Sequence, residues 1–220
     1  MPCFERFKAK FEDLPTDIPI FPLPGALLLP GGQLPLNIFE PRYVNMILDA
    51  MRTGTRLIGM IRPKDEESMG DDCALYKTGC AGRISSFAET PDDRILITLH
   101  GVARFDLLSD DLTDRGYRQA KVDFSKYKRD FTDEPNEKID RAVILRDLKQ
   151  YLKRCKMEAD WHMVEGAPDY VLVNTLAMVC PFGCQEQQAL LEAPNLPERA
   201  KIISCLLNMS MHDKDCREKQ

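Results

Sequence analysis

The sequence lacks the short motifs by which the common nucleotide-binding and hydrolytic enzymes are recognised. It contains no Gly-Lys pair, and therefore no G-x-x-x-x-G-K-[ST] loop that could hold the phosphates of ATP. It also contains no G-x-S-x-G nucleophile turn and no G-x-G-x-x-G dinucleotide fingerprint. These absences exclude the familiar P-loop, α/β-hydrolase and dinucleotide-binding classes, although they do not exclude every enzyme.

Histidine is scarce, and no histidine or cysteine stands at the spacing of a catalytic or metal site. His100, His162 and His212 are the three histidines, and none is paired in sequence with a carboxylate or a cysteine at ligand spacing. Cys180 and Cys184 enclose three residues, where the redox motif encloses two. We therefore expect no catalytic residue, no metal and no cofactor, and interpret the eight cysteines as thiols in a reducing compartment.

Clustered positive charge and long uninterrupted apolar runs are missing as well. The net charge is -5, and no run of five Lys or Arg residues occurs, which argues against a general nucleic-acid binder. The longest apolar stretches are interrupted by proline or are too short to cross a bilayer. The N-terminal sequence MPCFERFKAKFEDLP is too polar for a secretory signal, so we expect a cytoplasmic protein with no membrane partner.

Near its start the sequence is instead rich in proline within an apolar segment, from Ile18 to Met51. We interpret these prolines as punctuation between short extended pieces, because proline is tolerated at strand starts, edges and turns. Three such pieces are predicted, at residues 18–21, 26–29 and 34–38. Pro41 suits the first turn of a helix, and the residues after it that share one helical face are Tyr43, Met46, Ile47, Ala50 and Met51.

The hydrophobic period changes in the second half of the chain. Further strands are predicted at residues 56–61, 80–87, 95–100, 102–107 and 117–124. Helices are predicted at residues 135–158, 170–179, 185–192 and 197–209, where apolar residues recur at intervals of three and four residues. The order predicts an α+β protein: an N-terminal tail (1–14), a β-rich domain with one helix (15–130), a helical bundle (131–212) and a polar tail (213–220).

Three blocks of the sequence resemble the N-terminal domain of Lon proteases. IPIFPLPGALLLPGGQLPLNIFEPRY resembles its opening, where I-P-x-x-P-L is followed by a P-G turn, L-P-L and an E-x-R-Y helix start. The segments that contain Gly79 to Ile84 and Gly101 to Arg104 are similar to its G-x-x-A-x-I and G-x-x-R segments. The stretch from Asn174, through Q-A-L-L-E, to Arg199 is similar to its helical part.

The resemblance implies a PUA-like β-barrel followed by an α-helical bundle. It also implies a free-standing bacterial form of the domain, without ATPase or peptidase activity, that recognises unfolded or exposed polypeptide segments. Such a module could act as an adaptor in protein quality control. The sequence does not fix the oligomeric state.

The candidate polypeptide-binding residues are apolar residues in the proline-constrained region. They are Leu23, Pro24, Leu27, Leu28, Phe39 and Tyr43. Exposed apolar residues of this kind mark contacts with other chains, but each could equally belong to the core. We assign a structural role to the remaining motif residues, which are Glu40, Pro41, Arg42, Gly82, Arg83, Gly101 and Arg104.

Two alternatives are kept. PUA-like barrels also bind RNA, and a local basic face could bind nucleic acid or a small ligand. It would consist of Arg83, Arg104, Arg115, Arg118, Lys121, Lys126, Lys128 and Arg129. In the other alternative, Ser68 would be a peptidase nucleophile, because Pro63 to Gly70 superficially resembles the P-K-D-G-P-S-A-G motif of Lon peptidases. That segment lacks the Gly and Pro before the serine, and its acidic surroundings oppose the neutral lysine that a Ser/Lys pair needs.

Overall fold

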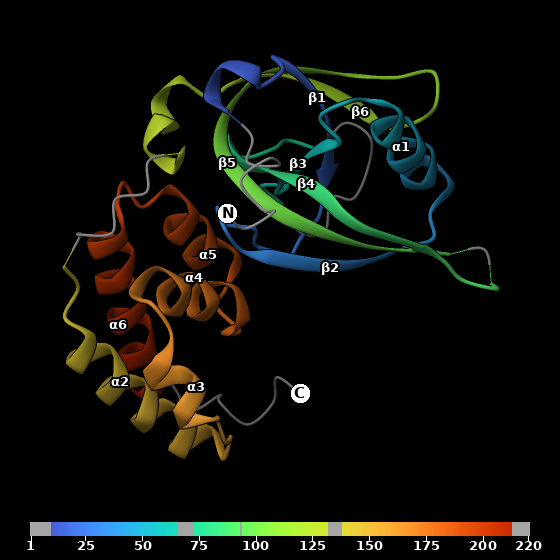
Figure 1. Ribbon diagram of the computed structural model, residues 1–220. Coiled ribbons are helices and arrows are strands. Elements are labelled where there is room, and N and C mark those ends of the chain that lie inside the picture. Colours follow the sequence, from blue (N-terminus) through green and yellow to red (C-terminus); the bar gives the residue numbers. More distant parts are fainter. Residues whose placement is uncertain (1–9, 66–72, 93, 132–137, 213–220) are drawn as a thin grey trace, which may run out of the picture. The chain divides into compact units, whose positions relative to one another are not determined.

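The computed structural model describes residues 10–65, 73–92, 94–131 and 138–212 (Figure 1). The chain divides into two compact units, residues 1–133 and 134–220, which are described separately. In the first unit the elements are η2 (Phe11–Asp13), β1 (Asp17–Pro22), β2 (Gln33–Ile38), α1 (Pro41–Arg52), β3 (Leu57–Ile61), β4 (Thr78–Glu89), β5 (Ile95–Leu112), β6 (Arg118–Asp123) and η3 (Ser125–Phe131). None of the helices in the described ranges is long and apolar enough to span a membrane.

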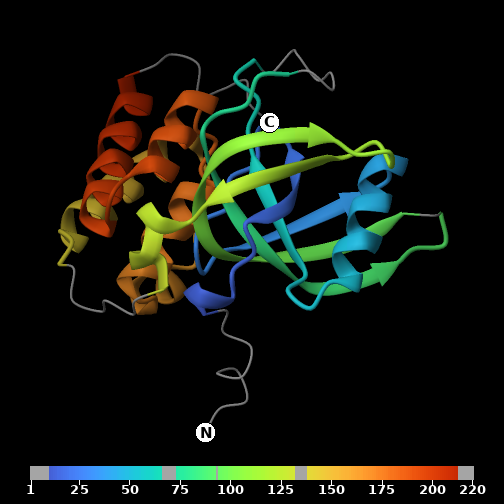
Figure 2. The ribbon, with the colours of Figure 1, turned by 90° about the horizontal axis from the view of Figure 1, so that it is seen from above.

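The six strands of the first unit form one mixed sheet. Its order is β2-β5-β4-β3-β1-β6, and an additional pairing between β5 and β6 closes the last five strands into a circuit (Figure 2). β1 runs parallel to β3, whereas the other pairs are antiparallel. All five strands of the circuit contribute to one core, which consists of Ile18, Ile20, Leu57, Ile61, Ala81, Ala103, Phe105, Ala120, Val122 and Phe124.

Helix α1 begins at Pro41, as the sequence predicts, and buries four of the five residues of the predicted face, while Met51 is half-buried. Tyr43, Met46, Ile47 and Ala50 are buried, and the Tyr43 ring lies 4.1 Å from the Phe21 ring, centroid to centroid. Pro41 removes no hydrogen bond from the helix, because the N–H groups of the first helical turn have no acceptor within the helix. The predicted helix is therefore confirmed.

The segment at residues 26–29 is not a strand, so that prediction was wrong. It pairs with no strand in the described part of the chain, yet Leu27, Leu28 and Leu29 are buried. The residues that follow this segment form backbone hydrogen bonds with Gly101: Gly31 N–H donates to Gly101 C=O, and Gly101 N–H donates to Gly32 C=O, both at 2.9 Å. Burial of the leucines, rather than a ladder, accounts for the apolar pattern there.

The predicted strands at 95–100 and 102–107 form one continuous strand, β5. The break in its hydrophobic pattern marks a shift in register, because Gly82 pairs with Gly101 while Ala81 pairs with Ala103. One extra residue, Val102, is thereby inserted, as in a β-bulge. The bulge changes the side-chain alternation without ending the strand.

The second unit is helical. Its elements are α2 (Arg141–Cys155), α3 (Trp161–Gly166), α4 (Asp169–Val179), α5 (Cys184–Glu192) and α6 (Leu196–His212). The helix predicted at 135–158 is shorter among the described residues, because Asp140 caps its start by accepting from Val143 N–H and Lys156 ends it in a left-handed conformation. Helix α3 lies between the helices predicted at 135–158 and 170–179, where the sequence predicts no helix, because six residues are too few to show a helical period.

We expect Gly101→Ala to destabilise the first unit strongly. An added Cβ would lie 2.0 Å from the Leu29 carbonyl oxygen, and this backbone atom cannot move away without breaking the neighbouring contacts. We expect a loss of about 3 kcal/mol in the free energy of unfolding, measured by urea denaturation.

The matched control is Gly54→Ala, because a Cβ there meets nothing within 4 Å. It should change the free energy of unfolding by less than about 1 kcal/mol. Equal stability of the two variants would show that the close approach at Gly101 is not a constraint.

Candidate functional site

The candidate site lies where β4 and β5 extend beyond the closed circuit and β2 pairs with β5. β3 pairs with β4 only as far as Arg83, so that the second half of β4 pairs with β5 alone. The first half of β5 pairs with β4 on one side and with β2 on the other. This three-stranded extension has β5 in the middle and β2 and β4 at its edges.

One face of the extension is apolar and belongs to the core. Ile95, Ile97 and Leu99 of β5 are buried, and their partners on β2 are Ile38, Leu36 and Leu34 in that order. Residues directly opposite each other in a sheet share a face. Gly82 allows close packing here, since a Cβ at that position would lie 2.6 Å from Leu28 and 3.0 Å from Leu99.

The other face of the extension is open and carries no charge, and we refer to it as the uncharged face. Leu96 pairs with Asn37 on one side and Ala88 on the other, and Thr98 pairs with Pro35 and Ser86. The uncharged face consists of Pro35, Asn37, Ser86, Ala88, Leu96 and Thr98. Five of the six are exposed, and Thr98 is half-buried.

Leu96 is the anomaly on this face. In the alternating strand Ile95–His100, the buried positions are apolar and the outward positions are Leu96, Thr98 and His100. A leucine at an outward position with 45% of its surface exposed does not serve the core. It offers an apolar contact at the centre of an uncharged patch.

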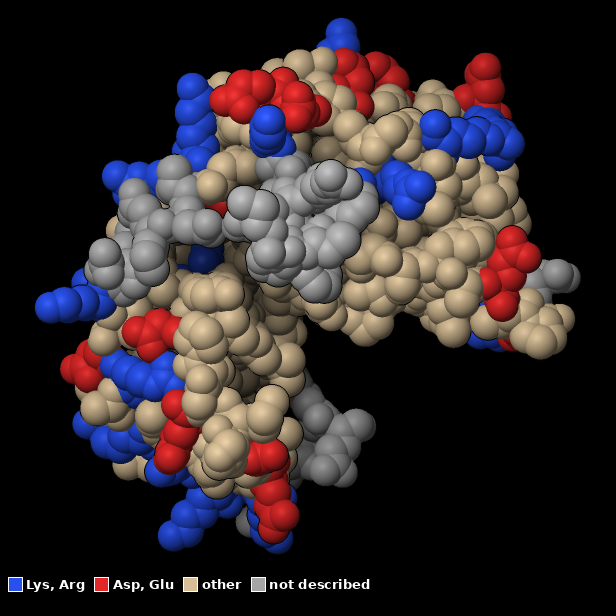
Figure 3. Space-filling view, in the orientation of Figure 1, with Lys and Arg blue, Asp and Glu red and all other residues tan. Residues whose placement is uncertain are grey.

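Charged residues border the uncharged face at its two ends. His100 pairs with Arg83 at one end. At the other end, the Arg94 guanidinium lies 5.6 Å from the centroid of the Phe39 ring and forms an ion pair with Asp92. Phe39 is 62% exposed, so the ring adds apolar surface at that border. In Figure 3 the surface in view over β2 and the β4–β5 hairpin is largely without charged side chains, which gather at the end of the hairpin.

The structure divides the six candidate binding residues. Leu27, Leu28 and Tyr43 have exposed fractions of 3%, 2% and 8%, so they are core residues and the core alternative holds for them. Leu23 and Pro24 are half-buried, and Phe39 is exposed. Leu96 is not among these six candidates, although an apolar residue at an outward position of an alternating strand is a signal that the sequence contains.

Glu40 and Arg42 lie at the corner between β2 and α1. The Arg42 Nη2 to Glu40 Oε2 distance is 2.9 Å, and Arg42 Nε also donates to the same oxygen at 3.0 Å. The Arg42 guanidinium lies 4.7 Å from the centroid of the Tyr43 ring. Charge-assisted contacts of this kind agree with the predicted structural role, in which Glu40 and Arg42 hold the corner between β2 and α1.

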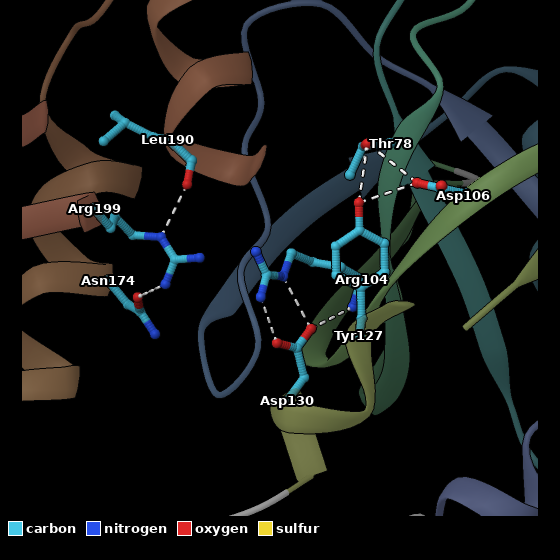
Figure 4. Close-up of polar contacts among 8 residues, drawn as sticks. All are labelled: Thr78, Arg104, Asp106, Tyr127, Asp130, Asn174, Leu190 and Arg199. Carbon is cyan, nitrogen blue, oxygen red and sulfur yellow. Dashed lines mark hydrogen bonds and ion pairs between the residues drawn. The ribbon is translucent and has the colours of Figure 1, made fainter. Parts of the chain in front are cut away.

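Arg104 is buried and paired with a carboxylate (Figure 4). Its Nη2 and Nε atoms lie 2.7 and 3.0 Å from the two oxygens of Asp130, and its backbone N–H donates to Asp130 at 2.9 Å. Burial lowers the pKa of Arg104, but the hydrogen bonds and charge of Asp130 outweigh it, so that the pKa is raised. This pair joins β5 to η3.

A second polar network lies beside that pair. The Arg104 guanidinium is 4.7 Å from the centroid of the Tyr127 ring. The Tyr127 hydroxyl donates to Asp106 at 3.0 Å and lies 3.1 Å from the Thr78 hydroxyl (Figure 4). Every member of the set contacts another member, which is the arrangement of a structural network rather than of an open catalytic centre.

In the second unit, buried Arg199 joins three helices. Its Nε atom donates to Leu190 C=O of α5 at 2.9 Å, and its Nη1 atom donates to Asn174 Oδ1 of α4 at 3.0 Å (Figure 4). These residues belong to the third block of the sequence resemblance. Their contacts show why arginine, with several donors in a fixed fork, stands at that position in α6.

Half of the alternative basic face is paired with carboxylates. Four of its eight members contact carboxylates, in the pairs Arg104–Asp130, Arg115–Asp49, Arg118–Asp110 and Lys126–Asp106. Ser68 lies outside the described residues. Within the described ranges, no group of three or more His, Cys, Asp or Glu side chains is arranged to hold a metal ion.

Solved structures with the same fold are N-terminal domains of Lon proteins. The Lon N-terminal domain protein from Xanthomonas campestris superposes with a TM-score of 0.61 at 23% identity, covering 84% of this chain and 95% of that one. The N-terminal domain of Mycobacterium avium complex Lon protease superposes with a TM-score of 0.62 at 14% identity, covering 87% and 98%. The chain therefore has the α+β fold of Lon N-terminal domains, with a mixed sheet and several helices.

The sequence comparison shows the family. Residues 17–209 match the family described as ATP-dependent protease La (LON) substrate-binding domain, and the chain belongs to this family. Lon protease 2 of Myxococcus xanthus is 29% identical over 206 residues, which are 90% of this chain and 24% of that protein. Lon protease of Parabacteroides distasonis is 29% identical over 213 residues, or 93% and 25%. The chain thus spans about a quarter of the length of these curated relatives.

We expect Asp130→Ala to destabilise the first unit, because it leaves the Arg104 guanidinium buried without its carboxylate. Removing one partner of a buried ion pair lowers the free energy of unfolding by about 3–5 kcal/mol. Chemical denaturation measures this change.

Asp92→Ala is the matched control, because it removes the partner of Arg94 from an exposed ion pair of similar length. It should leave the denaturation midpoint nearly unchanged. If both variants unfolded at the same denaturant concentration, the Arg104–Asp130 pair would not have the structural role described above.

Proposed function

We propose that this chain is a non-catalytic polypeptide-recognition module that binds unfolded or exposed segments of other proteins on the uncharged face. The observation that carries the proposal is Leu96, an exposed leucine at the centre of six uncharged residues. Membership of a family described as a substrate-binding domain supports the same role. We further propose that the module acts as an adaptor in protein quality control and that it works in the cytoplasm.

The chemistry of the uncharged face suits segments that a folded protein would bury. Leu96, Ala88 and the neighbouring Phe39 offer apolar contacts, while Asn37, Ser86 and Thr98 offer hydrogen bonds that do not depend on charge. Burial of a large apolar side chain contributes about 1.5–3 kcal/mol, and part of this gain is lost in ordering the bound segment. We therefore expect weak binding, with dissociation constants of about 10 μM or above.

The fold assignment extends this proposal. The closed circuit of β1, β3, β4, β5 and β6 is proposed to be a PUA-like barrel, corresponding to residues 15–130. The helices of residues 131–212 are proposed to form the bundle of the same domain family. In this assignment the binding face belongs to strands that extend beyond the barrel.

A second exposed apolar pair on β5 is a less suitable site. Leu108 and Leu112 are 65% and 54% exposed, but they alternate with Asp110 and lie next to Asp111. A segment bound there would have to desolvate carboxylates. The pair is therefore a useful control surface.

Binding of nucleic acid or a small ligand through the barrel is the other candidate, but the carboxylates paired with four of the basic residues do not favour it. The two functions differ in their response to salt. Phosphate contacts weaken steeply as salt rises, whereas contacts on an uncharged face do not. Binding that is lost between low and moderate salt would contradict recognition by the uncharged face.

We expect Leu96→Glu to weaken binding of fluorescein-labelled casein by about tenfold, because the glutamate places a charge at the apolar centre of the face. Fluorescence anisotropy measures the affinity, and gel electrophoresis checks that the casein stays intact. Leu108→Glu is the matched control and should bind within about twofold of the unchanged protein. Equal effects of the two substitutions, or cleavage of the casein, would contradict the proposal.

A further inference from the structure

The three-stranded extension has two edges, and they differ in the hydrogen bonds that they can offer. Among the described residues, no strand pairs with the outer edge of β2, and none pairs with the outer edge of β4 beyond Ile84. An edge of this kind presents a row of backbone N–H and C=O groups that another extended chain can pair with. Which residues present these groups follows from the hydrogen bonds next to each edge and from the alternation along a strand.

On β2 the edge is interrupted. Gly32 C=O accepts from Gly101 N–H and thus faces β5. Backbone groups alternate in direction along an antiparallel strand, so Leu34 and Leu36 face β5 while Pro35 faces outward. Proline has no N–H, and its ring occupies the place of an incoming strand. The middle of this edge therefore does not accept another strand.

On β4 the outward donors are intact. Thr90 N–H donates to Arg94 C=O at 2.9 Å, so the backbone groups of Thr90 face the β5 side of the hairpin. Because the direction alternates along the strand, the backbone groups of Ala88 and Ser86 also face β5, and the N–H groups of Phe87 and Glu89 face outward. The other end of β4 gives the same assignment. Ile84 N–H donates to Arg56 C=O, so the backbone groups of Ile84 face outward. Without a shift, Ser86 would face outward too, but the register shift between Ile84 and Ser86 moves the alternation by one residue, so Ser86 faces β5.

The side chains along this edge leave it accessible. Ser85, Ser86, Ala88 and Glu89 are exposed, and Phe87 is half-buried. The segment contains no proline or lysine, which often protect an exposed edge; the register shift lies before Ser86, and the one charged residue, Glu89, stands at the end of the strand. A strand added here would place alternate side chains next to Ser86 and Ala88, and so would extend the uncharged face by one strand.

We propose that the second half of β4 binds an extended, uncharged polypeptide segment by strand addition, through the outward backbone groups of Phe87 and Glu89. The inference rests on the proposed function, since it names how the recognised segment is held. Backbone pairing supplies affinity that is independent of sequence, and the uncharged face selects alternate side chains without charge. The occupant is thus an extended segment, not a helix and not a folded surface.

The test uses a proline at an outward position of the full chain. Glu89→Pro removes one outward N–H and no hydrogen bond to β5, while Glu89→Ala removes the same side chain and keeps the N–H. The probe is a short fluorescein-labelled peptide in which Thr alternates with Val and Leu. We expect Glu89→Ala to bind within about twofold of the unchanged protein and Glu89→Pro to bind about tenfold more weakly, by anisotropy. Thermal unfolding of both variants checks that they are equally folded.

Amide hydrogen exchange, followed by NMR, provides a second readout without a substitution. Saturation with the peptide should slow exchange of the Phe87 and Glu89 amides by about tenfold or more and leave the Ser86 and Ala88 amides unchanged.

Equal binding by the two variants, or unchanged exchange at Phe87 and Glu89 with the peptide bound, would overturn strand addition and leave recognition by the uncharged face intact. Failure of the unchanged protein to bind would overturn both. Protection of the same two amides by a second copy, in the absence of peptide, would also overturn the proposal.

Discussion

The close approach of two backbone segments at Gly101 determines the arrangement of the first unit. The Leu29 carbonyl oxygen occupies the space of a Cβ at Gly101, and Gly31 and Gly32 exchange hydrogen bonds with Gly101. Directly across the ladder, Gly82 admits the Leu28 side chain. Two glycines that face each other on β4 and β5 therefore let residues 27–32 lie against the sheet and start β2 beside β5.

Gly101 also lies at the boundary between the closed circuit and the three-stranded extension. At the bulge next to Gly101, β5 leaves the closed circuit, whose interior is filled by Phe105 and its neighbours, and enters the three-stranded extension. Beyond it, one face packs on the core and the other is open. The buried pair of Arg104 and Asp130 fixes β5 to η3 within the unit, three residues after Gly101. The structural residues and the residues proposed to bind polypeptide thus lie on different stretches of one strand.

Much of this fold could be predicted from the sequence, because local patterns determine it. Pro41 and the apolar face after it predicted α1, and three blocks of motifs predicted the family. The strand predicted at 26–29 was wrong because burial and strand pairing leave the same apolar pattern in a short segment. Helix α3 was missed because a single capped turn and a half has no measurable period. The partner of Arg104 could not be predicted either, since Asp130 lies 26 residues away and only the folded chain brings them together.

The candidate site was harder to predict than the fold. The leucines at 27 and 28 have the composition of a binding patch but fill the core. The alternation along β5 marks Leu96 as an outward apolar residue, but its uncharged neighbours on β2 and β4 are known only from the register of the sheet. The central claim, that the uncharged face holds extended polypeptide, is tested most directly by site-specific cross-linking. Benzoylphenylalanine at position 96 should cross-link to labelled casein under ultraviolet light, and the same residue at position 108 should not. Cross-links from position 108 alone, or equally from both positions, would contradict the account.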